Sequence, residues 1–273
     1  MSVFSTKSRE IDAKIRYILN CQHAPTKGLK VREKIVYQEV DPCPYLEGED
    51  SKTPLRYQFQ PLSGPQTDFS FQNGDRRVGR MLYDTQCPSC SACEAIRIQV
   101  NEFSPSKSQR RILRKNEDIR VEMSRSFCTP EKLEMYNKHK NLRGLNKRET
   151  AMTASGYENW FSRSCLDTRE FHYSIGDRLV GVSVLDFGEK DISSVYFFFD
   201  PDFSARSLGT FSALFEIMWM KSQQRRFYYL GLYVQECSHL NYKARFYPHQ
   251  RRVQGHWRAF SSAKTSRAEA RLL

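Results

Sequence analysis

In Asp191-Ile-Ser-Ser-Val-Tyr-Phe-Phe-Phe-Asp200, β-branched and aromatic residues are concentrated as in a buried strand, and Pro201 ends the run. An apolar helix is predicted next, over residues 213–222, followed by a second strand, Phe227-Tyr-Tyr-Leu-Gly-Leu-Tyr-Val234. A strand, a helix and a strand in this order are typical of a parallel pair joined by one crossover.

Antiparallel strands are predicted upstream of this unit. Residues 169–175 and 178–187 both have strand character, and Gly176-Asp177 between them is a hairpin turn signal. Antiparallel strands combined with one crossover helix fit an α+β or mixed α/β domain. Three further helices are predicted, over residues 131–141, 155–164 and 239–246.

The N-terminal part of the chain is rich in turn signals. A strand is predicted over residues 31–40, and prolines then interrupt the chain repeatedly up to residue 65. We therefore expect a small irregular module, held in part by its cysteines, and not regular layers. The prolines are Pro42, Pro44, Pro54, Pro61 and Pro65.

Cysteines are concentrated in this module. Cys87-Pro-Ser-Cys90-Ser-Ala-Cys93 places three thiols close together in the sequence, and Cys43 lies upstream. Four thiolates could close a tetrahedral zinc site or hold an iron–sulfur cluster, and the spacing does not choose between them. Reduced structural thiols are the alternative.

The composition also indicates a compartment and a partner. No apolar run reaches about 20 residues, and the N-terminus carries charged residues where a signal peptide would be apolar. We therefore expect a cytoplasmic protein with free thiols, because a reducing compartment disfavours disulfides. A formal net charge of +12 predicts attraction to a polyanion, above all a nucleic acid.

A basic helix offers a surface for that partner. Ser104-Pro105-Ser106 is a helix start signal, and the basic residues that follow are spaced to share one face. Like charges on one face repel one another, so phosphate contact is favoured over a solvated face, which stays the alternative. The residues predicted to bind phosphates are Lys107, Arg110, Arg111, Arg114 and Lys115.

The motif Arg206-x-x-Gly209-x-Phe211 precedes the apolar helix. Strand, motif, helix and second strand together resemble the core of a GNAT acyltransferase, in which backbone N–H groups at the helix start hold the pyrophosphate of acyl-CoA. Phe211 stands where that family has a small residue, and its ring is expected to obstruct the pyrophosphate. This expectation argues against an acyl-CoA acetyltransferase. It does not affect the inference that the chain has this fold.

A second resemblance is more specific and runs from about residue 40 to 250. The segment from Tyr229 to Phe246, with Cys43-Pro-Tyr45-Leu46, the three clustered cysteines and Ser106-Lys-Ser-Gln-Arg110-Arg111, resembles the aminoacyl-tRNA–protein transferases. In particular, it resembles the bacterial leucyl/arginyl branch that acts on N-terminal Asp and Glu. The resemblance implies a GNAT-like C-terminal domain that moves an amino acid from charged tRNA to a protein's α-amine and marks that protein for degradation.

The residues fit this chemistry. Aminolysis of an aminoacyl ester is intrinsically easy, so positioning and oxyanion stabilisation can supply most of the rate, and no cofactor is required for the chemistry. The resemblance places Asn241, Tyr242 and Lys243 in the active-site lining as catalytic candidates. Glu236 and Asp186 are candidates for a general base, without a ranking. The alternative for Tyr242 is an aromatic ring packed beneath the sheet.

An acidic acceptor side chain requires a cation, and the planar fork of arginine suits a carboxylate well. A solvated basic loop or contact with the tRNA backbone is the alternative. The predicted acceptor-binding residues are Arg76, Arg77, Arg80 and Arg245.

The cysteine pattern departs from that of the eukaryotic relatives, which have a Cys-x2-Cys pair and a later adjacent pair associated with an iron–sulfur cluster. Leu46 occupies the place of the second early cysteine. A zinc or iron–sulfur site therefore stays open beside metal-free thiols. Its predicted ligands are Cys43, Cys87, Cys90 and Cys93.

The expected organisation has four parts: a leader over residues 1–30, a Cys-containing module over 31–104, a GNAT-like transferase domain with the basic helix over 105–260, and a mobile tail over 261–273. The predicted function is transfer of leucine, or alternatively arginine, from aminoacyl-tRNA to proteins with N-terminal Asp or Glu. An acyl-CoA acetyltransferase and a non-enzymatic module that binds metal or nucleic acid stay open beside it.

Overall fold

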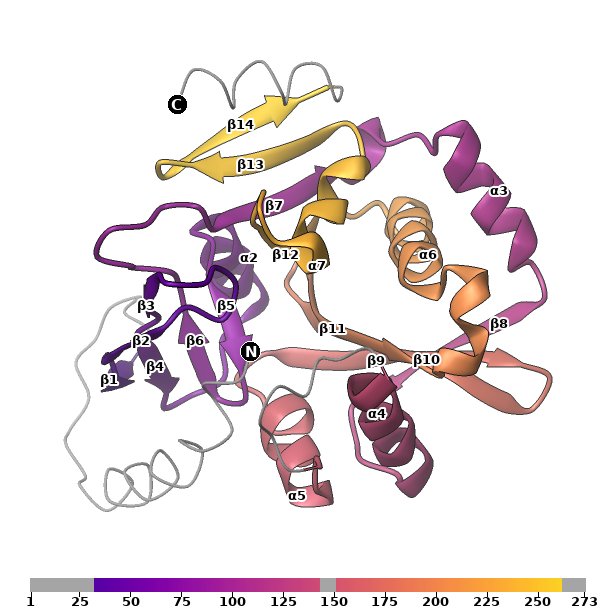
Figure 1. Ribbon diagram of the computed structural model, residues 1–273, viewed down its shortest axis with the longest axis horizontal. Helices are drawn as coiled ribbons and strands as arrows, with labels where there is room; N and C mark the ends of the chain where they lie inside the picture. The colour runs from indigo at the N-terminus through magenta and orange to yellow at the C-terminus, as the bar shows by residue number, and fades with distance from the viewer. Residues whose placement is uncertain (1–31, 143–150, 262–273) are drawn as a thin grey trace.

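The computed structural model describes residues 32–142 and 151–261 (Figure 1). The predicted leader and all but the first residue of the predicted tail lie outside the described residues. None of the helices in the described part combines the length and the apolar character that a membrane crossing needs.

A large sheet dominates the fold and makes it a mixed α/β structure. Its strand order is β14-β13-β7-β12-β11-β10-β9-β8, and β11 and β12 are its parallel pair among otherwise antiparallel neighbours. The three predicted strands from residue 169 to 200, and the parallel strand after them, are confirmed. The strands are β7 (Glu94–Gln99), β8 (Ile119–Arg125), β9 (Asp167–Ile175), β10 (Arg178–Phe187), β11 (Ile192–Phe199), β12 (Phe227–Tyr233), β13 (His249–Val253) and β14 (His256–Phe260).

The helix α6 (Leu208–Ser222) crosses over between β11 and β12 and covers one face of the sheet (Figure 1). Leu214 and Ile217 of this helix pack against Phe171 and Tyr228 in the largest core cluster. The helix begins at Leu208, earlier than predicted, because Ser207 takes a left-handed conformation with φ 57° and turns the chain directly into it.

The opposite face is covered by α4 (Pro130–Leu142), α5 (Ala154–Tyr157) and the π-helical turn η2 (Glu158–Ser162) (Figure 1). Tyr136 and Phe161 from these segments pack against Val182 and Phe198 of the sheet. Both faces of the central strands are therefore buried, which explains why these strands are nearly continuous apolar runs.

The N-terminal module is more regular than predicted. It contains a four-stranded sheet of order β1-β4-β6-β5, a separate β2-β3 pair and the helix α2 (Gly64–Gln72). The prolines do not prevent this, because Pro42 ends a strand and Pro65 lies in the first helical turn, where no N–H bond is lost. The strands are β1 (Glu33–Tyr37), β2 (Val40–Pro42), β3 (Asp50–Lys52), β4 (Leu55–Gln58), β5 (Arg76–Val78) and β6 (Met81–Tyr83).

The strand β7 lies in the sequence range predicted for this module but belongs to the large sheet. It pairs with β12 and with β13, both more than a hundred residues further along the chain. The chain therefore returns from the small module into the large sheet before the basic helix begins.

The small module docks on the turn between β10 and β11 through α2. Asp68 of α2 accepts hydrogen bonds from the backbone N–H groups of Lys190 (3.0 Å) and Asp191 (3.2 Å). Arg226 closes the same region by pairing with Asp191 at 2.9 Å. These contacts fix the position of the module relative to the start of β11, where the parallel pairing with β12 begins.

A substitution at Gly188 tests this docking contact. A Cβ added at Gly188 would overlap the Asp68 carboxylate, so Gly188→Ala should lower the free energy of unfolding by about 1–3 kcal/mol, as overpacking does. Urea unfolding of the single variants and of the double variant with Asp68→Ala measures the effect. In the Asp68→Ala background the added methyl group meets no carboxylate, so Gly188→Ala should change the free energy of unfolding little. An equal decrease in both backgrounds would contradict this docking geometry.

Candidate active site

The parallel strands β11 and β12 separate soon after they meet. Their pairing covers Ile192 with Tyr228 and Ser193 with Tyr229 and does not continue. Beyond this point lies a cavity of about 1320 Å³ between the two strands. Residues 194–197 and Phe199 of β11 line it on one side, and Leu230 and Leu232 of β12 line it on another. The absence of a continued ladder thus leaves room for a ligand between two strands of the same sheet.

Elements from the whole chain close this cavity. The small module contributes Arg76 and Tyr83, α3 (Lys107–Lys115) contributes Gln109 and Ile112, and the start of α6 contributes Gly209. The cavity therefore runs from the cysteine-containing module to the beginning of α6, and both ends are needed to form it.

The structure brings the three catalytic candidates together in this cavity. Asn241 ends the single-turn helix α7 (Ser238–Asn241), and Tyr242 and Lys243 open the 3₁₀ turn η4 (Tyr242–Arg245), so the predicted short helix is confirmed in two pieces. All three residues line the cavity. The side chain of Asn241 donates to the Gln235 carbonyl at 3.1 Å, which braces the turn.

Lys243 lies in a strongly perturbed environment. Its Nζ donates to the Leu232 carbonyl at 2.8 Å, inside the wall that β12 forms. Burial, and secondly the neighbouring Arg76 cation, lower the pKa of Lys243 to about 7. A lysine in this environment is available as a neutral amine near neutral pH.

Arg76 spans the opening between the separated strands. Its guanidinium donates to Ser193 Oγ at 2.9 Å and to the Ser194 carbonyl at 2.8 Å. Gly231 of β12 has φ +91°, and a Cβ there would lie 3.1 Å from the Arg76 guanidinium carbon. Glycine at this position therefore both permits the left-handed backbone and makes room for the arginine.

Arg77 lines the cavity but is held by a carboxylate of the protein itself. Its Nε donates to Asp186 at 2.7 Å, and both side chains are only 1% exposed. Thr168 donates to the other oxygen of Asp186. Asp186 is therefore the counter-ion of Arg77, and neither Asp186 nor Glu236 is among the described residues that line the cavity.

The remaining acceptor-binding candidates are divided. Arg245 is exposed and lines the cavity. Arg80 does not: its guanidinium lies over the Tyr57 ring and donates to the Gln58 and Phe59 carbonyls within the small module. The structure thus brings Arg76, Arg77 and Arg245 to the cavity and leaves Arg80 outside its described lining.

Glu216 is a cavity residue that sequence reasoning missed. It lies on α6 and is 2% exposed, and its carboxylate accepts hydrogen bonds from Tyr173 (2.8 Å), Ser183 and Tyr228. Burial raises its pKa to about 7, despite these hydrogen bonds. The signal in the sequence was a single acidic residue in a largely apolar helix.

The predicted phosphate-binding residues form an exposed stripe on α3. The helix begins within the predicted start signal, with Ser106 as its cap and Pro105 just before it, and Ile112 and Leu113 anchor its other face on the core. Since Ser106, Ser108 and Gln109 at the start of the helix also line the cavity, the stripe begins at the cavity and leads away from it. The exposed residues are Lys107, Arg110, Arg111, Arg114 and Lys115.

The clustered cysteines lie at the module end of the cavity, where Cys43, Cys87 and Cys93 are part of the lining. Burial, followed by the charges of nearby Cys87, Cys43 and Cys90, raises the pKa of Cys93 to about 12. Within the described ranges, no three Cys, His, Asp or Glu side chains are arranged as a metal site. The four-ligand metal or cluster site at Cys43, Cys87, Cys90 and Cys93 therefore stays a prediction.

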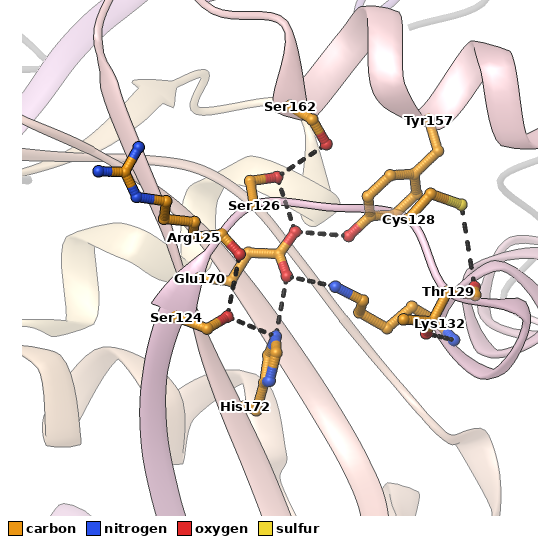
Figure 2. A network of polar contacts seen from close by, with 10 residues as sticks. All are labelled: Ser124, Arg125, Ser126, Cys128, Thr129, Lys132, Tyr157, Ser162, Glu170 and His172. Carbon is orange, nitrogen blue, oxygen red and sulfur yellow. Dashed lines mark hydrogen bonds and ion pairs between the residues drawn. The ribbon is translucent and has the colours of Figure 1, made fainter.

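A second polar network lies on the α4 side of the sheet (Figure 2). Glu170 pairs with buried Lys132 at 2.8 Å and accepts a hydrogen bond from Tyr157 at 2.8 Å. Ser124 and Glu170 both contact the same ring nitrogen of His172, its Nε2. A proton relay of the Ser-His-acid type needs both ring nitrogens, so this network holds α4 to β9 and is not a triad.

The expectation that the Phe211 ring obstructs the start of α6 is wrong. Its ring points into the core, where it packs edge-on against Tyr173, and it is not among the described residues that line the cavity. The start of α6 is therefore not obstructed by this side chain. The phenylalanine fits because helical spacing places Phe211 on the buried face while Gly209 and Thr210 face the cavity.

The pH dependence of stability tests the buried state of Glu216. Its pKa is about 7 in the folded protein and 4.5 ordinarily, so protonation favours folding: the contribution is complete below about pH 4.5 and is lost as pH rises through 7. Wild type should therefore lose about 3 kcal/mol of unfolding free energy from pH 4.5 to 8 that Glu216→Gln does not lose. Urea unfolding of both proteins measures this, and parallel curves would contradict it.

Comparisons with known proteins identify the family of this chain. The profile described as "Arginine-tRNA-protein transferase, N terminus" matches residues 41–111, and "Arginine-tRNA-protein transferase, C terminus" matches residues 131–253. The chain is 34% identical to an "Aspartate/glutamate leucyltransferase" of Pseudoalteromonas atlantica, over 81% of this chain and 94% of the relative. It is 33% identical to one of Saccharophagus degradans, over 80% and 93%.

Solved structures are more distant. L-PGS from Bacillus licheniformis matches with a TM-score of 0.39 and 13% identity, over 64% of this chain and 52% of that chain. FemX matches with a TM-score of 0.39 and 10% identity, over 66% and 63%. The sequence relatives, by contrast, confirm the resemblance inferred from the motifs, and the chain belongs to the aminoacyl-tRNA–protein transferases, the family of the arginine-tRNA-protein transferases and the aspartate/glutamate leucyltransferases.

Proposed function

We propose that this chain transfers leucine from leucyl-tRNA to the α-amine of proteins that begin with aspartate or glutamate. The names of the relatives support both the donor and the acceptors. The observation that carries the proposal is one cavity of about 1320 Å³ that holds Arg76, Lys243 and Arg245 beside the separated strands. The transferred leucine would then mark the acceptor for degradation.

We also infer that the large sheet and α6 are a GNAT-like acyltransferase core with the cysteine-containing module docked on it. The supporting observations are the parallel pair β11 and β12, the crossover helix between them and the early separation of the two strands. The acyl group carried by tRNA would occupy the space between the strands.

The reaction requires one proton to move. The acceptor nitrogen attacks the ester carbonyl, a C–N bond forms, the bond from that carbon to the ribose oxygen breaks, and a proton passes from nitrogen to the ribose oxygen. Lys243 is the group we assign to this transfer, because a neutral Nζ can accept the proton and return it to the leaving oxygen. Asn241 and Tyr242 adjoin it as lining residues.

The acceptor's acidic side chain would bind Arg76. Arg76 lies in the cavity wall and, among the described residues, its guanidinium bonds a hydroxyl and a carbonyl, so its charge is available to a carboxylate ligand. Arg77 is a weaker candidate because Asp186 already balances its charge. Arg245, exposed at the cavity, would supply a second cation.

The tRNA would lie along α3. The exposed basic stripe begins at the cavity, so a donor whose aminoacyl end enters the cavity would pass over this helix with its phosphates. Such contacts supply affinity more than sequence discrimination and weaken with salt. Lys138 on α4 is not assigned to the tRNA, because it is already paired with Asp200 and Asp202 at 2.7 Å.

The central experiment incubates the protein with tRNA carrying labelled leucine or labelled arginine, and with peptides that begin with Asp, Glu or Ala. Label should pass from leucyl-tRNA to the Asp and Glu peptides and not to the Ala peptide. Transfer from arginyl-tRNA alone would replace the proposed donor. No transfer to either acidic peptide would refute the proposed function.

Lys243→Met should lower the transfer rate by about a hundredfold or more, the usual contribution of a general base. Since the pKa of Lys243 is about 7, the wild-type rate should rise from pH 6 to 8, and the variant should lose that part of the rise. Single-turnover rates with saturating donor measure both effects. Lys221→Met, which removes an exposed lysine of α6, is the control and should behave as wild type.

Arg76→Gln should lower kcat/KM for the Asp peptide by about 30-fold or more, since it leaves a buried carboxylate without its cation. The rate with an Asn peptide should change little, so the preference for Asp over Asn disappears. Arg80→Gln is the matched control, because Arg80 lies outside the described lining. Equal losses with both peptides would show that Arg76 only supports the wall.

A further inference from the structure

The charges around the cavity are unevenly distributed. Of the described residues that line it, Glu216 is the only one with a carboxyl group, whereas Arg76, Arg77, Lys243 and Arg245 carry basic side chains. The basic side chains suit an acidic acceptor. A single buried carboxylate among them requires a different explanation.

The carboxylate of Glu216 has room for one more donor. Its Oε1 accepts hydrogen bonds from Tyr173 and Ser183, while Oε2 accepts from Tyr228. A carboxylate can accept about four hydrogen bonds, so Oε2 keeps capacity on its second lone pair. No cation of the described residues pairs with Glu216, and the rise of its pKa to about 7 agrees with an uncompensated buried acid.

The donor substrate brings a cation into this cavity. Leucine is esterified to tRNA through its carboxyl group, so its α-ammonium group stays free and takes no part in the bond changes. Burying such a group is costly unless it is paired and hydrogen-bonded. Tyr228, which donates to Glu216, and Ser194, which hydrogen-bonds Tyr228, are polar residues of the lining beside this carboxylate.

We propose that Glu216 is a donor-specificity residue, whose carboxylate pairs with the α-ammonium group of the leucine carried by tRNA. This assignment rests on the leucyl transfer proposed above. The arginine-lined side of the cavity then receives the acceptor, and Glu216 with Tyr228 receives the donor. As a consequence, aminoacyl-tRNA with a blocked α-amine, such as N-acylated aminoacyl-tRNA or peptidyl-tRNA, is rejected.

The test compares two donors that differ only at this group. Leucyl-tRNA is one, and the other is its deaminated counterpart, in which an α-hydroxyl replaces the α-ammonium. Wild type should prefer leucyl-tRNA by about 30-fold or more in kcat/KM, the usual effect of losing one partner of a buried charge pair. Glu216→Gln should lower the rate with leucyl-tRNA by that factor, leave the hydroxyl donor nearly unchanged and so abolish the preference.

Two further variants separate charge from structure. Glu216→Asp keeps a carboxylate and should retain a preference for leucyl-tRNA. Tyr173→Phe removes one hydrogen bond to Glu216 but not the charge, and should also retain it. Thermal melting and binding of each donor to unreacted enzyme confirm that the compared proteins are folded.

Equal losses with the two donors in Glu216→Gln would overturn the assignment and leave Glu216 as a structural acid. A wild type that uses both donors equally would overturn it as well. A Glu216→Gln variant whose pH profile changes in the same way with both donors would point instead to proton transfer. If wild type transfers from neither donor, the proposed function fails and the assignment fails with it.

Discussion

The short pairing of β11 with β12 is the constraint on which the rest of the structure depends. Two paired positions hold these parallel strands together, and beyond them residues of both strands line a cavity. Parallel pairing requires a crossover, and α6 supplies it while filling the core. The same helix contributes Gly209 and the buried Glu216 to the cavity lining, so one element both completes the fold and forms part of the site.

The small module completes the site. Asp68 and Asp191 fix it against the turn before β11, and from that position β5 places Arg76 across the opening between the strands. Arg77, the next residue along the strand, is buried against Asp186 and holds the module to β10. Adjacent arginines thus have different roles: Arg76 lies at the cavity opening and Arg77 holds the module to the large sheet. They differ because successive side chains of a strand point to opposite faces.

The charges in the cavity agree with the proposed placement of the two substrates. The basic side chains and the neutral form of Lys243 suit an acidic acceptor and the proton that its amine must lose. Glu216, neutral or charged near pH 7, suits the cation of the donor. Groups whose pKa values are displaced toward neutrality from opposite directions lie in one cavity, which is typical of sites built for reaction and not for packing alone.

By itself, the sequence determined the central strands, the capped basic helix, the crossover and the family, because these are local patterns or motifs in a fixed order. Local periodicity also sufficed to group the α3 cations on one face. Only the tertiary structure decided that β7 joins the large sheet, that Arg77 is neutralised by Asp186 and that Phe211 turns away from the cavity. It also decided that Glu216 reaches the site. Each of these outcomes depends on a partner distant in the sequence, and no pattern within one segment contains the position of such a partner.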